Sequence, residues 1–242
     1  MQIPVIYEDN DILVINKPAG LVVFNEPDSP QNEEKTLADY LIEELPYLKD
    51  NLAPRYGIAH RLDKDTSGAL LVAKDPKSLI FLQKQFKNRT IQKKYIALVV
   101  GVIKEAKGTI ETLIGRSMKD RKKQRVFLLG EPGSEGKRQA ITGYKVLEDF
   151  DGYTLLELTP KTGRKHQIRC HLNFIQHPIA GDKIYGFKNQ PAPKGLTHQF
   201  LHSSYLKFET PSGQVKEITA ELPEDLQNII KNLKQIYEQK NR

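Results

Sequence analysis

Side chains capable of chemistry are concentrated most densely in residues 60–68, which read HRLDKDTSG. This segment holds two carboxylates, two cations and two hydroxyls directly before an apolar stretch. Its Asp and Ser spacing matches the start of a calcium-binding EF-hand loop, but Lys74 occupies the position of the bidentate Glu, which argues against calcium. Two interpretations remain open. Asp and Ser side chains can bond the backbone at a turn closed by Gly68, or a carboxylate can act as a nucleophile beside a cation.

A second grouping is strongly basic, because residues 161–169 contain four cations and no acid. If the end of this segment is helical, His166, Arg169 and Cys170 lie on neighbouring faces and one cation could point inward. Otherwise the segment is a solvated basic face. His166 and His171 are five positions apart with no acidic third ligand nearby, which argues against a metal site.

Two further segments have residue types that contact nucleic acids. In Lys93-Lys94-Tyr95, cations precede an aromatic residue at the start of an expected strand. Such a group could contact phosphate and stack on a base, but Tyr95 could equally fill the core. Residues 116–125 (RSMKDRKKQR) carry six cations against Asp120. They form either a polyanion-binding surface or the tip of a hairpin.

The charge of the chain is distributed unevenly. The 242 residues carry a net charge of +7. Residues 1–50 hold 3 basic and 11 acidic residues, a net of −8, which leaves 34 basic and 19 acidic residues, a net of +15, in residues 51–242. Such an excess indicates either a polyanionic partner or a surface kept soluble by lysines.

Other features exclude whole classes of function. No apolar run approaches the roughly 20 residues of a membrane helix, and the N-terminal residues do not resemble a secretory signal. The single cysteine, Cys170, excludes an internal disulfide framework and a Cys-based zinc site, so a reducing, cytoplasmic setting is expected. Neither a Gly-x-Gly-x-x-Gly nor a Walker motif supports a nucleotide cofactor.

Regular elements must hold these segments in place. Apolar spacing predicts strands at 12–16, 21–24, 69–73, 94–100, 139–147 and 153–159, and helices at 36–45, 76–86 and 223–239. Thr36 is a plausible N-cap of the first helix, and Pro76 lies in the first turn of the second. Strands outnumber helices, and short turns join many of them. This pattern is typical of a largely antiparallel α+β domain.

Taken together and in order, the segments resemble the motifs of one family, the RluA-type RNA pseudouridine synthases. The resemblance covers nearly the whole chain, and residues 60–68 match the nucleophile motif in full. The other matching segments are Asn16–Gly20, Lys94–Ala97, Thr162–Arg169, His177–Asp182 with Tyr185–Gly186, and Leu201–Ser203 with Leu206, Phe208 and Pro211. Asn16 is a departure, since the family more often has Arg or Asp there.

The resemblance implies an α+β fold with a mixed, mainly antiparallel β-sheet, flanking helices and a central RNA-binding cleft. It also implies a single catalytic domain over residues 1–242. Many relatives carry an N-terminal S4 RNA-binding domain, but here the catalytic-type region begins almost at residue 1, so no S4 domain is expected. Residues 116–125 and 133–138 are then the segments expected to contact the RNA and to determine which target is selected.

The resemblance also implies roles for single residues. Asp63 would be the nucleophile, Arg169 the cation that keeps it ionised, and Tyr95 the side chain that stacks on the uracil and takes part in removing the C5 proton. Arg61 would enter the stack that the uridine leaves. The remaining residues expected to line the pocket or contact RNA are Leu62, Ile168, Arg164, Lys165, His166, Lys122 and Lys123.

Physical reasoning supports this division of roles. The uracil must leave its stack before the N1–C1′ bond can break and C5 can join C1′, at a cost of a few kcal/mol. Burial raises the pKa of a carboxylate, whereas a cation within about 4–6 Å favours its charged form. The Arg guanidinium is always charged and can donate two hydrogen bonds to one carboxylate. Because no redox or hydrolytic step occurs, no cofactor or metal is required.

The expected function is therefore cofactor-independent isomerisation of uridine in ribosomal or transfer RNA, with no membrane and no obligatory protein partner. Two alternatives remain. The chain could be a non-catalytic RNA-binding or assembly factor with the same fold, or an RNA nucleosidase that releases the base.

Overall fold

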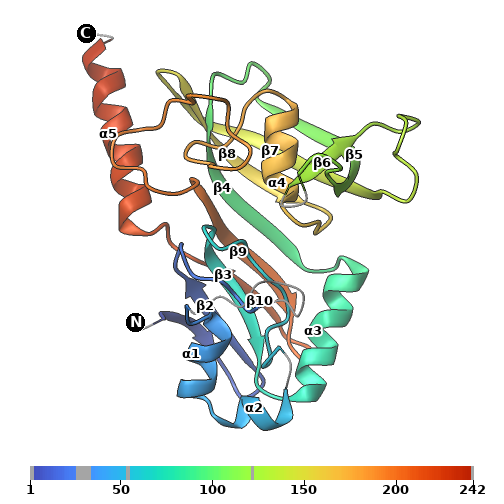
Figure 1. The fold of residues 1–242 in the computed structure, drawn as a ribbon. Coiled ribbons are helices and arrows are strands. Elements are labelled where there is room, and N and C mark those ends of the chain that lie inside the picture. The colour runs from blue at the N-terminus through green and yellow to red at the C-terminus, as the bar shows by residue number, and fades with distance from the viewer. Residues whose placement is uncertain (1–2, 26–33, 53–54, 121–122, 241–242) are drawn as a thin grey trace. The chain divides into compact units, whose positions relative to one another are not determined.

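The computed structural model describes residues 3–25, 34–52, 55–120 and 123–240. The chain divides into two compact units (Figure 1). The first unit comprises Met1–Gln92 and Ser203–Glu221, and the second comprises Lys93–His202 and Leu222–Arg242. Within the described ranges, no helix combines the length and apolar character needed to cross a membrane.

The first unit is built on strands that are mostly antiparallel, with helices beside them. Its strands are β1 (Val5–Glu8), β2 (Ile12–Lys17), β3 (Ser67–Ala73), β9 (Leu201–Glu209, of which Ser203–Glu209 belong to this unit) and β10 (Val215–Thr219), in the order β1-β2-β3-β9-β10. Its helices are α1 (Leu37–Glu44), α2 (Tyr47–Asn51) and α3 (Pro76–Asn88). The β2–β3 register places Lys17 opposite Gly68, so two segments singled out in the sequence become neighbours.

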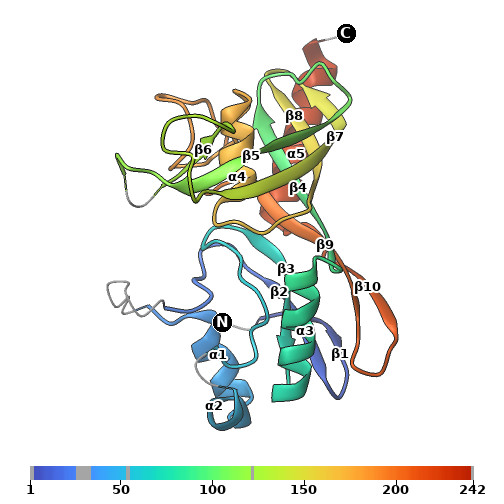
Figure 2. The same cartoon turned by 90° about the vertical axis from the view of Figure 1, so that its right-hand side faces the viewer.

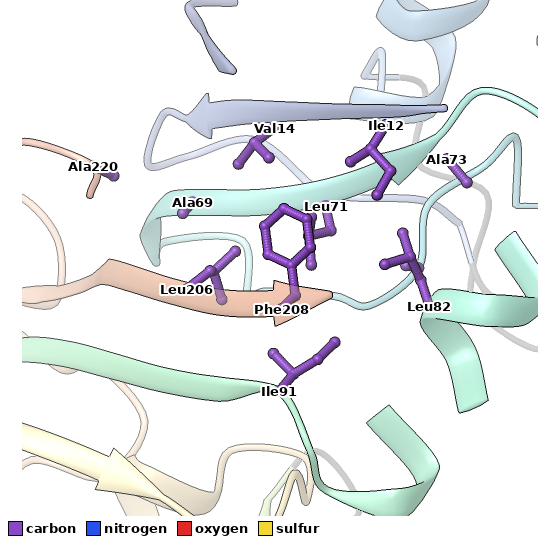
Figure 3. Close-up of a cluster of buried hydrophobic side chains, with 11 residues drawn as sticks. Ile12, Val14, Ala69, Leu71, Ala73, Leu82, Ile91, Leu206, Phe208 and Ala220 are labelled. Atoms are coloured by element: carbon purple, nitrogen blue, oxygen red, sulfur yellow. The ribbon is translucent and has the colours of Figure 1, made fainter. Parts of the chain in front are cut away.

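The core of the first unit lies between β2, β3, β9 and α3 (Figure 3). Ile12 and Val14 from β2, Leu71 from β3 and Leu82 from α3 are fully buried, and Phe208 from β9 packs among them. All seven residues of β3 are buried. Burial on both faces agrees with the continuous apolar run at residues 69–73, where a half-exposed strand would alternate apolar and polar residues.

The second unit is an antiparallel sheet with one short and one long helix. Its strands are β4 (Gln92–Val100, of which Lys93–Val100 belong to this unit), β5 (Lys107–Arg116), β6 (Gln124–Phe127), β7 (Arg138–Phe150) and β8 (Tyr153–Pro160). Their order in the sheet is β4-β8-β7-β5-β6. Its helices are α4 (Gln167–Phe174) and α5 (Glu224–Lys240). Helix α4 contacts β6 and β7 (Figures 1 and 2), and an ion pair of 2.9 Å between Lys234 and Glu148 joins α5 to β7.

Strand register shows which side chains share the face covered by α4. Tyr95 of β4 is opposite Leu158 of β8, and Leu158 is opposite Tyr144 of β7. Directly opposite residues of antiparallel strands point to the same face. Thr142 shares that face with Tyr144, because side chains alternate along a strand, and Thr142 bonds His171 of α4. Tyr95 therefore lies on the same face of this sheet as α4.

A buried polar network fixes α4 to that face. The fully buried His171 ring bonds the hydroxyl of Thr112 at 3.0 Å and that of Thr142 at 2.9 Å. The Gln167 amide donates to Thr142 at 2.9 Å and accepts from Thr162 at 2.7 Å. Burial lowers the pKa of His171 to about 4, so the ring is neutral at pH 7.

This neutral histidine predicts a loss of stability in acid. Between pH 6.5 and about 4 the unfolded chain binds a proton at His171 that the folded chain does not bind. The free energy of unfolding should therefore decrease as the pH is lowered across this window, by about 3 kcal/mol in total. His171→Gln, which does not titrate, should flatten that part of the curve in urea titrations at several pH values. Parallel curves for the two proteins would contradict the assignment.

The predicted fold class is confirmed, since the sheet is mainly antiparallel with flanking helices. The helix at 36–45 is also confirmed: the Thr36 hydroxyl accepts from the Asp39 N–H, and the Asp39 carboxylate accepts from the Thr36 N–H at 2.8 Å. The strand predicted at 21–24 is wrong. The carbonyls of Val22 and Val23 instead accept the N–H groups of Leu37 and Ala38, so this segment caps the start of α1.

Candidate active site

The candidate nucleophile lies on the loop that enters β3. The Thr66 N–H donates to the Asp63 carbonyl at 3.1 Å, which closes a tight turn. Asp63 is half-buried and Leu62 is buried. Gly68, at the start of β3, has a φ of +114°, and a Cβ there would lie 2.3 Å from the Ser203 carbonyl oxygen. Gly68 thus allows β9 to approach the backbone that follows the Asp63 loop.

A buried lysine anchors this loop. The Lys17 side chain is fully buried, and its Nζ donates to the carbonyls of Pro18 at 2.7 Å, Leu21 at 2.8 Å and Lys64 at 2.9 Å. Burial lowers the pKa of Lys17 to about 7, against the attraction of Asp65 and Asp63. The three acceptors match the three donors of an ammonium group. Lys17 therefore joins the turn after β2 to the loop that carries Asp63.

Arg61 is held at the surface of the first unit beside an aromatic ring. Its guanidinium lies 5.1 Å from the centroid of the Phe24 ring, and that of Arg55 lies 5.3 Å from the same centroid. His60, the first residue of the motif, has a different role. Its Nε2 accepts from the Leu71 N–H at 3.1 Å, and its ring contacts Phe86, so it links the loop to the core.

In the second unit, α4 presents a buried arginine that is already paired. Arg169 Nε and Nη2 donate to the two carboxylate oxygens of Asp182 at 2.7 and 2.9 Å, and both side chains are buried. Burial alone would raise the pKa of Asp182, but Arg169 and the N–H groups of Ile184 and Tyr185 hold it below its usual range. Asp182 thus fixes the orientation of the guanidinium.

Tyr185 completes the surroundings of Arg169. The guanidinium lies 5.1 Å from the centroid of its ring. The Tyr185 hydroxyl is 2.9 Å from His166 Nδ1 and accepts the Gln124 N–H of β6 at 2.8 Å. Burial raises the pKa of this hydroxyl, so it stays protonated. His166 has a φ of 54° and is the N-cap residue of α4. Its expected role as an RNA contact stays a prediction.

The remaining predicted residues have varied surroundings. Ile168 is buried on α4. Arg164 Nε donates to the Gln139 carbonyl at 2.9 Å, and Lys165 is exposed. Lys123 is half-buried near the start of β6, whereas Lys122 lies outside the described residues.

The predicted residues divide between the two units. Asp63, Arg61 and Leu62 belong to the first, whereas Tyr95, Ile168 and Arg169 belong to the second. Sequence reasoning gave no role to Lys17, Asp182 or Tyr185. Each lies in a segment that matches a family motif, and that membership was the signal that could have identified them.

Comparison with known proteins identifies the class. The family model for RNA pseudouridylate synthase matches residues 11–174. The chain therefore belongs to the RNA pseudouridine synthase family, of the RluA type, and the enzymes of this family are isomerases.

Individual relatives are similar over most of the chain. The uncharacterized RNA pseudouridine synthase YlyB of Bacillus subtilis is 41% identical over 97% of this chain and 74% of its own length. Ribosomal large subunit pseudouridine synthase D of Yersinia pestis is 38% identical over 95% of this chain and 70% of its own. A solved structure, human RNA Pseudouridylate Synthase Domain Containing 1, superimposes with a TM-score of 0.75 at 29% identity, covering 92% of this chain and 84% of that one.

Proposed function

We propose that this protein converts uridine to pseudouridine at defined positions in structured ribosomal or transfer RNA, and that both units serve one catalytic domain. One observation carries the proposal. Arg169 is a permanently charged group, buried and held in one orientation by Asp182, on the helix α4 that packs against the sheet face carrying Tyr95. Binding alone gives no reason to bury and orient a guanidinium in this way, whereas a reaction through an ionised carboxylate does.

In this proposal the residues divide the reaction between them. The uridine leaves its stack, Arg61 takes the vacated place, and the uracil stacks on Tyr95, with Leu62 and Ile168 as the proposed apolar residues of the pocket. Asp63 acts as the nucleophile, and Arg169 keeps it ionised. The N1–C1′ bond breaks, the uracil rotates, and C5 bonds to C1′ as the C5 proton is lost and N1 gains one.

Basic residues outside the pocket are proposed to hold the RNA. Arg164, Lys165, His166 and Lys123 lie on or next to α4 and β6, and Lys122 is included on the basis of sequence alone. Ribosomal RNA is the substrate to test first, because several relatives are named for the ribosomal large subunit. Transfer RNA is the alternative substrate.

The test uses ribosomal and transfer RNA tritiated at uracil C5. A synthase is expected to release tritium and to leave pseudouridine in an intact chain. A nucleosidase would leave an abasic site, and a pure binder would change neither the label nor the chain. Either of these outcomes with both RNAs would contradict the proposal.

A further inference from the structure

Two neighbouring lysines at the start of β4 have opposite surroundings. Side chains alternate between the two faces of a strand, so Lys93 shares the face of Tyr95 and Lys94 points to the other. Lys94 Nζ forms an ion pair with Glu157 of β8 at 3.1 Å. Lys93 instead points toward the face that α4 covers.

Lys93 lies beside the basic segment that leads into α4. Its Nζ is 3.7 Å from the position that a Cβ on Gly163 would occupy. Gly163 belongs to residues 161–169, which hold four cations and no acid. Across the described ranges, Lys93 Nζ forms neither a hydrogen bond nor an ion pair with another side chain. The ammonium thus lies against the backbone at Gly163, and no carboxylate among the described residues pairs with it.

This placement is unfavourable for a cation. Burial lowers the pKa of Lys93 to about 8, and no nearby carboxylate opposes that effect. A lysine that served only to solubilise the surface would extend into water. Lys93 is half-buried, and an ammonium that has lost part of its hydration without gaining a counter-charge is stabilised when an anion arrives beside it.

We propose that the Lys93 ammonium binds a backbone phosphate of the RNA next to the uridine that stacks on Tyr95. The inference rests on the proposed function. Two residues apart on one strand face, Lys93 and Tyr95 have Cα atoms about 6.6 Å apart, so the phosphate and the base can belong to the same or adjacent nucleotides. A lysine binds phosphate as a point charge and requires no second donor.

Lys93 could instead accept a proton during the reaction. A conservative variant distinguishes this role from a phosphate contact. Lys93→Arg keeps a positive charge but cannot lose a proton at neutral pH. A phosphate contact should therefore survive this substitution, whereas a proton acceptor should not. Lys93→Met removes both.

The experiment measures the affinity of each variant for fluorescein-labelled oligouridylate across a range of KCl concentrations. Lys93→Met should bind about tenfold more weakly, and its log–log salt slope should be lower by about 0.7, as expected for one lost phosphate contact on a single strand. Lys93→Arg should restore the slope. Lys94→Met is the matched control, because it removes an adjacent charge that is already paired, and its slope should equal that of the wild type.

Three results would overturn the inference: an unchanged slope in Lys93→Met, an equal loss in Lys94→Met, or failure of Lys93→Arg to restore the slope. Unfolding is not a confounding cause, because Lys93→Met removes a half-buried charge that has no counter-charge among the described residues and should fold at least as stably, as a urea titration would show. The binding measurement needs no turnover. A wild-type protein that releases no tritium would therefore contradict the proposed function without deciding the phosphate contact.

Discussion

Replacing Asp63 with Asn is expected to abolish tritium release from C5-labelled RNA while leaving RNA affinity within about tenfold, or about 1.4 kcal/mol. The amide is nearly the same size as the carboxylate, so the turn closed by Thr66 and the anchor from Lys17 remain. The charge that is proposed to attack the nucleotide is lost. Single-turnover assays and binding titrations on the same preparation separate the two effects.

The neighbouring carboxylate provides a matched control. Asp65 lies two residues further along the same loop and is also half-buried. Asp65→Asn should keep turnover within about tenfold, because its charge lies near Lys17 but is not the proposed nucleophile. If Asp63→Asn retains the wild-type rate, or if Asp65→Asn is the inactive variant, the nucleophile has been assigned to the wrong residue.

The helices and strands that depend on residues close together in the chain could be predicted from the sequence. Thr36 and Asp39 form a capping box three residues apart, and the apolar run of β3 is buried on both faces. The segment 21–24 has the same apolar character as a strand, but its carbonyls are used by α1 instead of by a neighbouring strand. That difference depends on what folds next to the segment, which periodicity does not record.

The candidate site shows the same limit at longer range. The resemblance of residues 60–68 to a family motif pointed to Asp63 as the candidate nucleophile. Neither the motif nor the residue types indicated that Lys17, 47 positions earlier than Lys64, donates to this loop. Arg169 was identified as a cation that could point inward, but its partner Asp182 was not. Asp182 pairs with Arg169 only because the loop after α4 folds back against the helix. Neither the charges nor the spacing of the residues in the sequence predicts this fold of the loop.

Asp182→Asn is expected to lower kcat by about 100-fold. The Arg169 guanidinium loses the pair of hydrogen bonds to a carboxylate that orients it, and a displacement of about 1 Å can lower a rate by about this factor. The same change leaves a buried charge without its counter-charge, which should cost about 3–5 kcal/mol of unfolding free energy. Asp225→Asn is the control. That exposed carboxylate pairs with His198 at 2.9 Å, and its loss should cost at most about 1 kcal/mol.

A second variant separates positioning from stability. Replacing the pair together, as Arg169→Met with Asp182→Leu, removes both buried charges and should restore most of the stability that Asp182→Asn loses. It should not restore turnover, because it removes the cation that is proposed to keep Asp63 ionised. Assays run well below the unfolding midpoint of each variant, with kcat and RNA affinity measured separately, would test this. If the apolar double variant recovers activity along with stability, Arg169 contributes only to packing, and the catalytic role proposed for it is wrong.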